Sequence, residues 1–149
     1  MWNVLLENGV APCGLGCRDT LRLEAGMHLY GSEMNTTTTP YEASLGWIIN
    51  SKKPYIGQEI LEQQKEKGVD KKLVAITLTK RNIARHDYPV MDDDEVIGKV
   101  TSGTWSPSLS IPIALAYVPT DLSKVGSVVN VKIRGKLEKA TVVKKPFYC

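Results

Sequence analysis

The spacing of the apolar residues changes near residue 70, and no other feature of the chain constrains the fold as strongly. From Leu73 onward, apolar and polar residues alternate and many are β-branched, which is typical of strands with one buried face. Before residue 70 the apolar residues recur at helical spacing, and Gly and Pro interrupt them. We therefore expect the 149-residue chain to divide into a helical part, residues 1–70, and a β part, residues 71–149.

The second part is expected to contain short antiparallel strands separated by turns. The strands are predicted at residues 73–78, 95–101, 113–118, 128–133 and 139–143. Strands of this length and spacing favour a small barrel or sandwich. In the fourth of them Val131 and Ile133 should face the core, whereas Lys132 and the following Arg134 should face water. The predicted fold class is accordingly α+β, with a small antiparallel β-barrel after a helical region.

The first part is expected to contain short helices. They are predicted at residues 1–9, 17–27, 41–45 and 56–67. Asp19 is expected in the first turn of its helix, where a carboxylate suits the helix dipole. Thr39 followed by Pro40 is typical of a helix start. The last helix is the clearest, because Ile56 and Ile60 begin an apolar face and a glycine follows the segment.

Charge and composition exclude several classes of function. The chain has 19 Lys+Arg and 16 Asp+Glu, and the net charge of +3 is too small to indicate a nucleic-acid-binding protein. Its longest strongly apolar run, Ile111 to Val118, is far shorter than the ~20 residues of a membrane-spanning helix. The N-terminus lacks the basic residues of a signal peptide. Three cysteines without framework spacing favour reduced thiols in the cytoplasm.

Several motifs have little support as sites. The segment 14–19 begins like a dinucleotide-binding loop, but Asp19 stands in place of the third glycine. Asp92 to Glu95 is best explained as a solvated hairpin turn. Two histidines and the absence of a nucleophile elbow give little support to triad chemistry. No metal site is expected from the remaining ligand-type residues, because they lack paired spacing: Cys13, Cys17 and His28.

Two arginines of the predicted helix 17–27 are the most interesting charged residues. Arg18 and Arg22 are four positions apart and therefore share a helix face. A guanidinium group can bind a carboxylate through two parallel hydrogen bonds, which suits a ligand with a glutamate group. The alternative is a structural ion-pair network with Asp19 and Glu24, and the pattern alone favours this network.

The segment 101–109 is a second candidate site. It combines hydroxyl side chains, a glycine and the aromatic Trp105 between two predicted strands. Functional residues often collect on such loops, although a tight corner of the barrel explains the composition equally well.

The chain resembles the glycine cleavage system T-protein family, the aminomethyltransferases. The likeness begins with Gly14-Leu-Gly-Cys-Arg-Asp-Thr-Leu-Arg-Leu-Glu-Ala-Gly-Met27 and runs in family order to the end of the chain. The other matching segments are residues 29–31, 38–47, 88–90, 98–109, 113–118, 131–136 and 142–147. Because the segments keep their order along the whole chain, they are more specific than any single motif.

The resemblance implies an enzyme of three domains around a central hole that holds tetrahydrofolate. Residues 1–70 would be the C-terminal part of the folate-binding domain, and residues 71–149 the small C-terminal barrel. The family reaction moves an aminomethyl group from lipoyl-bearing H-protein to tetrahydrofolate, which gives 5,10-methylenetetrahydrofolate and ammonia. The family's catalytic aspartate and its Gly-Tyr-Thr-Gly-Glu segment precede the matching segments, so no catalytic residue is expected in this chain.

The partners follow from the same resemblance. They are lipoyl-bearing H-protein and the missing N-terminal part of the same protein, with no nucleic acid and no membrane. The chain is expected to look like the C-terminal part of a T-protein, to be inactive alone and to self-associate through its uncovered face. The expected location is the cytoplasm, or the mitochondrial matrix in a eukaryote.

Arg18 matches the arginine that holds the folate glutamate carboxylate in family members, and it is therefore the preferred folate-binding residue. Trp105 and Ser106 are candidates for a loop near the folate. Cys17 stands where alanine is common in the family, and Trp105 stands where phenylalanine is common. Two other functions stay open: a tetrahydrofolate-dependent demethylase of the same fold, and a non-catalytic barrel that binds a partner.

Overall fold

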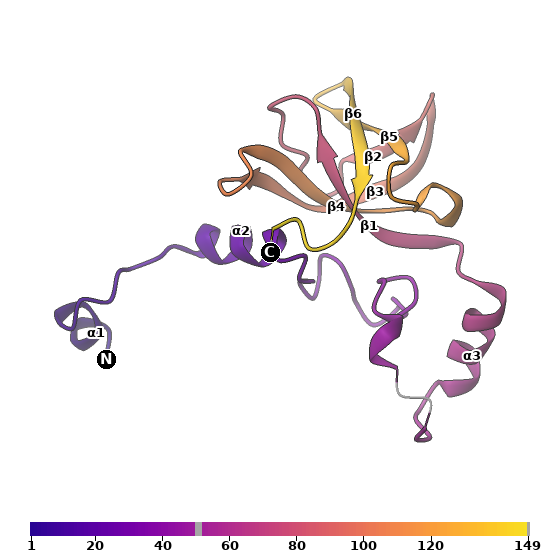
Figure 1. Cartoon of the computed structure of the whole chain (residues 1–149), viewed down its shortest axis with the longest axis horizontal. Coiled ribbons are helices and arrows are strands. Elements are labelled where there is room, and N and C mark those ends of the chain that lie inside the picture. Colours follow the sequence, from indigo (N-terminus) through magenta and orange to yellow (C-terminus); the bar gives the residue numbers. More distant parts are fainter. Residues whose placement is uncertain (50–51, 149) are drawn as a thin grey trace.

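Residues 71–143 form a closed barrel of antiparallel strands, and the helical N-terminal region lies along one end of it (Figure 1). The computed structural model describes residues 1–49 and 52–148. The strands are β1 (Lys71–Leu78), β2 (Pro89–Asp92), β3 (Glu95–Ser106), β4 (Ile111–Pro119), β5 (Val128–Ile133) and β6 (Lys136–Val143). Their order around the barrel is β1-β4-β3-β2-β5-β6, and β6 pairs with β1 to close it. The predicted antiparallel barrel is confirmed.

The barrel interior is filled by the alternating apolar residues of its strands. On β5 Val131 and Ile133 are buried while Lys132 is exposed, as is Arg134 in the turn that follows, so the predicted alternation is confirmed. The interior cluster consists mainly of valines, alanines and isoleucines contributed by every strand. Fully burying a side chain of valine size contributes about 1.5–3 kcal/mol, so this cluster is the main source of the barrel's stability.

Strands β1 and β4 are buried on both faces, which explains their continuous apolar runs. Residues such as Ala114 and Val118 point into the barrel. Their neighbours in the strand, such as Ile113 and Leu115, form a second cluster with Leu23 of helix α2 (Leu15–Glu24) on the outer face. The helix therefore covers the apolar outer face of β1 and β4.

The strands differ most from the prediction at β2 and β3, while β1, β4 and β6 are only a few residues longer than expected. Strand β2 was not expected, because it has only four residues, begins with a proline and runs into the acidic turn. Strand β3 extends to Ser106 rather than ending at residue 101, so the expectation of a loop after that strand is wrong for residues 102–106. Its pairing with β4 shifts register between Val100 and Ser102, and this bulge lets the strand continue around the barrel.

The other helices are α1 (Trp2–Glu7), α3 (Gln58–Lys67) and the short 3-10 helix η1 (Gly46–Ile48). Helix α2 begins at Leu15 rather than Cys17, and it ends at Glu24 rather than Met27 because Gly26 adopts a left-handed conformation, with φ of 69°. Asp19 therefore does not lie in the first turn, as the sequence predicted.

The predicted helix over 41–45 is wrong, since only a single turn forms there. The start signal itself is correct: Glu42 Oε2 accepts a hydrogen bond from the Thr39 backbone N–H at 2.9 Å, and the Glu42 N–H is donated to Thr39 Oγ1. Ser44 then adopts a φ of 57°, which ends the turn before a second one can form.

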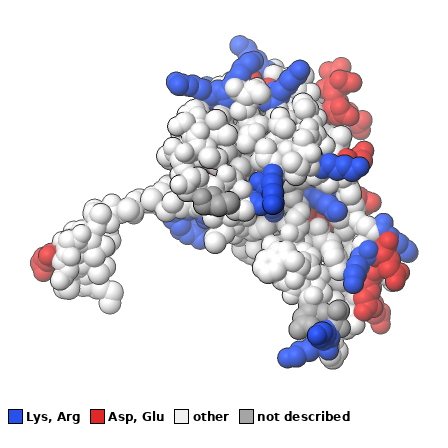
Figure 2. All heavy atoms as spheres, viewed as in Figure 1, with Lys and Arg blue, Asp and Glu red and all other residues white. Residues whose placement is uncertain are grey.

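Much of the helical region lies apart from the barrel and exposes apolar side chains. Helices α1 and α3 contain no buried residue, and Ile60 on the predicted apolar face of α3 is 60% exposed. Helix α1 projects from the molecule at the end of an extended segment, and Figure 2 shows this arm almost without charged side chains. None of the helices in the described ranges is long and apolar enough to cross a membrane.

The closeness of β3 to the β1–β2 connection can be tested at Gly103. A Cβ atom at this position would lie 1.9 Å from the carbonyl oxygen of Ala84, so Gly103→Ala must displace backbone. We expect the free energy of unfolding to fall by about 1–3 kcal/mol or more, measured by urea denaturation followed by circular dichroism.

The matched control is Gly16→Ala in α2, where a Cβ would meet no atom within 4 Å. Alanine is favoured over glycine in a helix by up to about 1 kcal/mol, so this variant should be unchanged or slightly more stable. A Gly103→Ala protein as stable as the parent would contradict the close approach.

Candidate functional site

The main candidate site is an open pocket of about 450 Å³ where α2 faces the barrel. Its walls come from the first half of α2, the turn after it, the β1–β2 connection and the middle of β3. The lining residues are Leu15, Gly16, Arg18, Asp19, Arg22, Leu29, Ser32, Arg85, His86, Thr101, Ser102 and Gly103. Both parts of the chain therefore contribute to the pocket.

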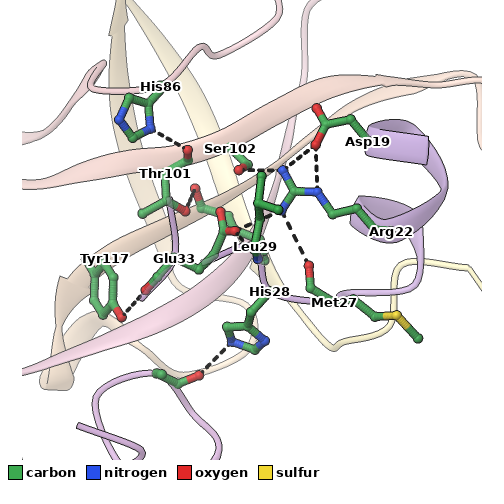
Figure 3. A network of polar contacts seen from close by, with 12 residues as sticks. Asp19, Arg22, Met27, His28, Leu29, Glu33, His86, Thr101, Ser102 and Tyr117 are labelled. Atoms are coloured by element: carbon green, nitrogen blue, oxygen red, sulfur yellow. Dashed lines mark hydrogen bonds and ion pairs between the residues drawn. The ribbon is translucent and has the colours of Figure 1, made fainter. Parts of the chain in front are cut away.

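Arg22 lies at the base of this pocket and is fully engaged (Figure 3). Its Nη2 lies 2.6 Å from Asp19 Oδ1, and its Nε also donates to that oxygen at 2.7 Å. Its Nη1 lies 2.8 Å from Glu33 Oε2, and its Nη2 donates to Ser102 Oγ at 2.7 Å. Because only 9% of the side chain is exposed, Arg22 joins α2 to β3 and has no capacity left for a ligand.

Glu33 extends this network into the protein. The Leu29 N–H donates to its Oε2 at 2.8 Å, and the Tyr117 hydroxyl donates to its backbone oxygen at 2.7 Å. Burial, together with the nearby Glu42 and Glu33 carboxylates, raises the pKa of Tyr117 to about 12. Tyr117 therefore keeps its proton and stays a donor at neutral pH, which holds the turn that carries Glu33 against β4.

Arg18 lies one helical turn before Arg22 and differs from it in exposure and in its lack of partners among the described residues. Its side chain is exposed, lines the pocket and makes no hydrogen bond or ion pair with another residue of the described ranges. The ion-pair network expected from the sequence exists, but it joins Asp19 and Arg22 with Glu33. Neither Arg18 nor Glu24 belongs to it.

Glu24, at the end of α2, forms a separate buried contact with the barrel. Ser106 Oγ donates to its Oε1 at 2.5 Å, and Ser108 Oγ donates to its Oε2 at 2.9 Å. Burial alone would raise the pKa of Glu24, but these hydrogen bonds outweigh it and lower the pKa below its ordinary value. The carboxylate therefore stays ionised and holds α2 in place.

Comparison with known proteins places the chain in a family. A family model described as the glycine cleavage T-protein C-terminal barrel domain matches residues 71–148, and the GCVT N-terminal domain model matches residues 1–53. The chain belongs to the glycine cleavage T-protein family. The resemblance read from the sequence is thus confirmed.

Individual members of the T-protein family are similar along the whole chain. It is 59% identical over 150 residues to an aminomethyltransferase of Parasynechococcus marenigrum (strain WH8102) and 55% identical to one of Prochlorococcus marinus (strain NATL1A). The crystal structure of glycine cleavage system aminomethyltransferase T from Bartonella henselae is 33% identical, with a TM-score of 0.89 over 96% of this chain. The match to the Parasynechococcus protein covers 99% of this chain. The chain itself spans only about 41% of the length of that protein and of the Bartonella protein.

The other residues singled out in the sequence lie outside the pocket of this T-protein chain. Trp105 lies on β3 with Arg81 over its ring at 5.8 Å, and Ser106 is buried against Glu24. Cys13 and Cys17 are exposed, whereas the His28 ring contacts the Ala43 carbonyl oxygen. The acidic residues 92–95 form the β2–β3 turn, as predicted.

Sequence reasoning missed the contributions of Arg85, His86 and Ser102 to the pocket. Ser102 lies in the segment 101–109 that the composition singled out, four positions before Ser106. The β1–β2 connection has no pattern of its own, so only the closed barrel brings Arg85 and His86 to α2.

The Glu24 contact predicts a pH-dependent effect of Ser106→Ala. A carboxyl group whose pKa is lowered on folding contributes stability above its unfolded value of about 4.3, and the contribution is lost as the pH falls through the lowered folded value. We expect Ser106→Ala to reduce the free energy of unfolding by about 1–3 kcal/mol at pH 7. The reduction should shrink as the pH falls through the lowered pKa of Glu24, because the carboxylate then takes up a proton.

Urea denaturation at a series of pH values between about 3 and about 7, a range that begins below the ordinary carboxyl pKa, measures this difference. Ser127→Ala is the matched control, because the half-exposed Ser127 side chain makes no hydrogen bond with the described residues. A loss that is the same at every pH would show that the Ser106 hydroxyl does not stabilise the Glu24 carboxylate.

Proposed function

We propose that this chain forms part of an aminomethyltransferase that transfers the aminomethyl group of lipoyl-bearing H-protein to tetrahydrofolate, giving 5,10-methylenetetrahydrofolate and ammonia. In this proposal the pocket on α2 binds the glutamate end of tetrahydrofolate, and Arg18 is the folate-binding residue. The observation that carries the proposal is the contrast between Arg18 and Arg22. One arginine is saturated by carboxylates of the chain, and the other faces the pocket without a partner in the described ranges.

The pocket suits a ligand that carries carboxylates. Three arginines line it, and Asp19, the single acidic residue among its lining residues, is already paired with Arg22. An exposed guanidinium can bind a carboxylate through two parallel hydrogen bonds, and this geometry favours arginine over lysine. The names of the similar proteins support aminomethyl transfer rather than demethylation.

The proposal distinguishes residues that bind the substrate from residues that position them. Arg18 binds and orients the substrate, while Arg22, Asp19 and Glu33 hold α2 against β3 so that Arg18 faces the pocket. Ser106 is a positioning residue that acts through Glu24, and Trp105 has no direct contact with the pocket.

We propose that the catalytic carboxylate lies outside this chain. Such a group stabilises the positive charge that develops on the amine of the aminomethyl group. Asp19 is unsuited to this role because Arg22 already neutralises it. The chain spans about 41% of the length of its relatives, so the rest of a T-protein is the proposed source.

The proposed partners are therefore the remaining portion of a T-protein and lipoyl-bearing H-protein. We place the division between the folate-binding part and the barrel at residues 70 and 71, where β1 begins. Exposed apolar side chains concentrate before this boundary, and Trp47 is 81% exposed. A six-residue helix such as α1 is not stable alone, which supports packing of α1 on that remaining portion.

Arg18→Ala tests the binding role. Loss of a charge-assisted hydrogen-bonded pair costs about 1.5–3 kcal/mol, so the dissociation constant for 5-formyltetrahydrofolate should rise at least about tenfold. Nuclear magnetic resonance titration of the 149-residue chain reads this change even when binding is weak.

Arg134→Ala is the control for net charge, since Arg134 lies in the turn between β5 and β6, away from the pocket-lining residues. An unchanged dissociation constant for Arg18→Ala, with circular dichroism of the folded protein preserved, would remove Arg18 from the site.

The chain alone should give no 5,10-methylenetetrahydrofolate from aminomethylated H-protein, because the charge-stabilising carboxylate would be absent. Adding a polypeptide that supplies the remaining portion of a T-protein should restore turnover. Product formation is measured by absorbance after coupling to a dehydrogenase. Turnover by the chain alone at the rate of a full-length T-protein would place the catalytic carboxylate within residues 1–149.

A further inference from the structure

We propose that Arg85, on the β1–β2 connection, is a second carboxylate-binding residue of the pocket, so that the site takes a ligand with two separate carboxylates. This inference rests on the proposed function, because the glutamate unit of tetrahydrofolate carries an α- and a γ-carboxylate. It assigns one guanidinium to each carboxylate, with Arg18 contributed by α2 and Arg85 by the barrel.

The first observation is the distribution of partners among the arginines of the pocket. Arg22 binds the carboxylates of Asp19 and Glu33. Arg18 and Arg85 are both exposed and line the pocket, and neither makes an ion pair or a side-chain hydrogen bond within residues 1–49 and 52–148. The pocket therefore presents two unneutralised guanidinium groups from two different elements.

The second observation is that the backbone around Arg85 is fixed while its side chain is not. Ala84 is fully buried, and its carbonyl oxygen lies so close to Gly103 that no Cβ would fit there. Beyond Arg85, a ring nitrogen of His86 contacts the Thr101 carbonyl oxygen at 2.6 Å. The Asp87 N–H donates to the Val100 carbonyl oxygen at 2.9 Å.

These contacts attach the connection to β3 on both sides of Arg85. The guanidinium group is consequently held near the pocket at little further cost in backbone entropy, which favours binding. Binding residues are positioned best on a rigid backbone, and the contacts of His86 and Asp87 with β3 supply one for Arg85.

The acidic residue nearest in sequence does not neutralise Arg85. Asp87 Oδ1 accepts a hydrogen bond from Lys99 Nζ at 3.0 Å, and this contact lowers the pKa of Asp87. Its Oδ2 lies 3.3 Å from His86 Nε2. Arg85 is therefore available, and a second carboxylate of the ligand is the group of matching charge and shape.

The experiment is a thermodynamic cycle between protein and ligand. The 149-residue chain, Arg85→Ala and Arg18→Ala are each titrated by nuclear magnetic resonance with 5-formyltetrahydrofolate, its α-monoamide and its γ-monoamide. Each monoamide removes one negative charge with little change in shape. Arg81→Ala is the matched control, because Arg81 belongs to the same connection but lies over Trp105 outside the pocket.

The unsubstituted chain should bind the diacid about tenfold more tightly than either monoamide. We express the preference as the dissociation constant of a monoamide divided by that of the diacid. In Arg85→Ala this ratio should fall to about one for one monoamide and stay unchanged for the other. In Arg18→Ala the two monoamides should exchange these roles. Arg85→Lys should restore part of the lost preference, since it keeps the charge but not the fork geometry.

The outcomes that overturn the inference are distinct from those that overturn the proposed function. If Arg85→Ala keeps both preferences while Arg18→Ala loses one, Arg85 binds no carboxylate and the proposed function stands. If the unsubstituted chain shows no preference for the diacid, or no binding at all, the proposed function fails and the second carboxylate site fails with it.

Discussion

The buried carboxylate of Glu24 is the contact on which the position of α2 depends. A buried charge must be satisfied by hydrogen bonds, and here the donors come from the β3–β4 corner. The backbone oxygen of the same residue accepts the N–H groups of Phe147 and Tyr148. Helix, barrel and C-terminal segment thus meet at one residue, and the adjoining Leu23, which is fully buried, adds apolar contact at the same place.

The pocket is a consequence of this anchoring. Glu24 and Arg22 hold the last turn of α2 against the barrel, and the first turn of the helix lines the pocket together with β3. The α-helical repeat then places Arg18 one turn above Arg22 on the same side. Two arginines of one motif therefore have different environments: Arg22 joins the helix to the barrel, and Arg18 lies at the surface of the pocket.

The alternation of residues predicted the barrel, because burial on one face of a strand leaves a local signal such as Val131 and Ile133 against Lys132. The strands buried on both faces were predicted from the same alternation and from their β-branched residues. By contrast, the bond between Ser106 and Glu24 joins residues 82 positions apart, and no local pattern encodes it. The roles of Arg18 and Arg22 were equally ambiguous in the pattern, since the partner that decides them, Glu33, lies on a turn that propensities do not predict. The prediction of a helix over 41–45 failed for another reason. Its start signal was correct, but Ser44 adopts a left-handed conformation that ends the turn.

The closure of the barrel has a consequence for how this chain meets other molecules. Every strand from β1 to β6 is paired on both sides, so the sheet has no open edge and cannot recruit a foreign strand by backbone pairing. The apolar arm formed by residues 1–14 lies outside the barrel and is helical at its tip. Association must therefore proceed through side-chain shape and charge, which discriminate between partners far more finely than a shared backbone ladder does.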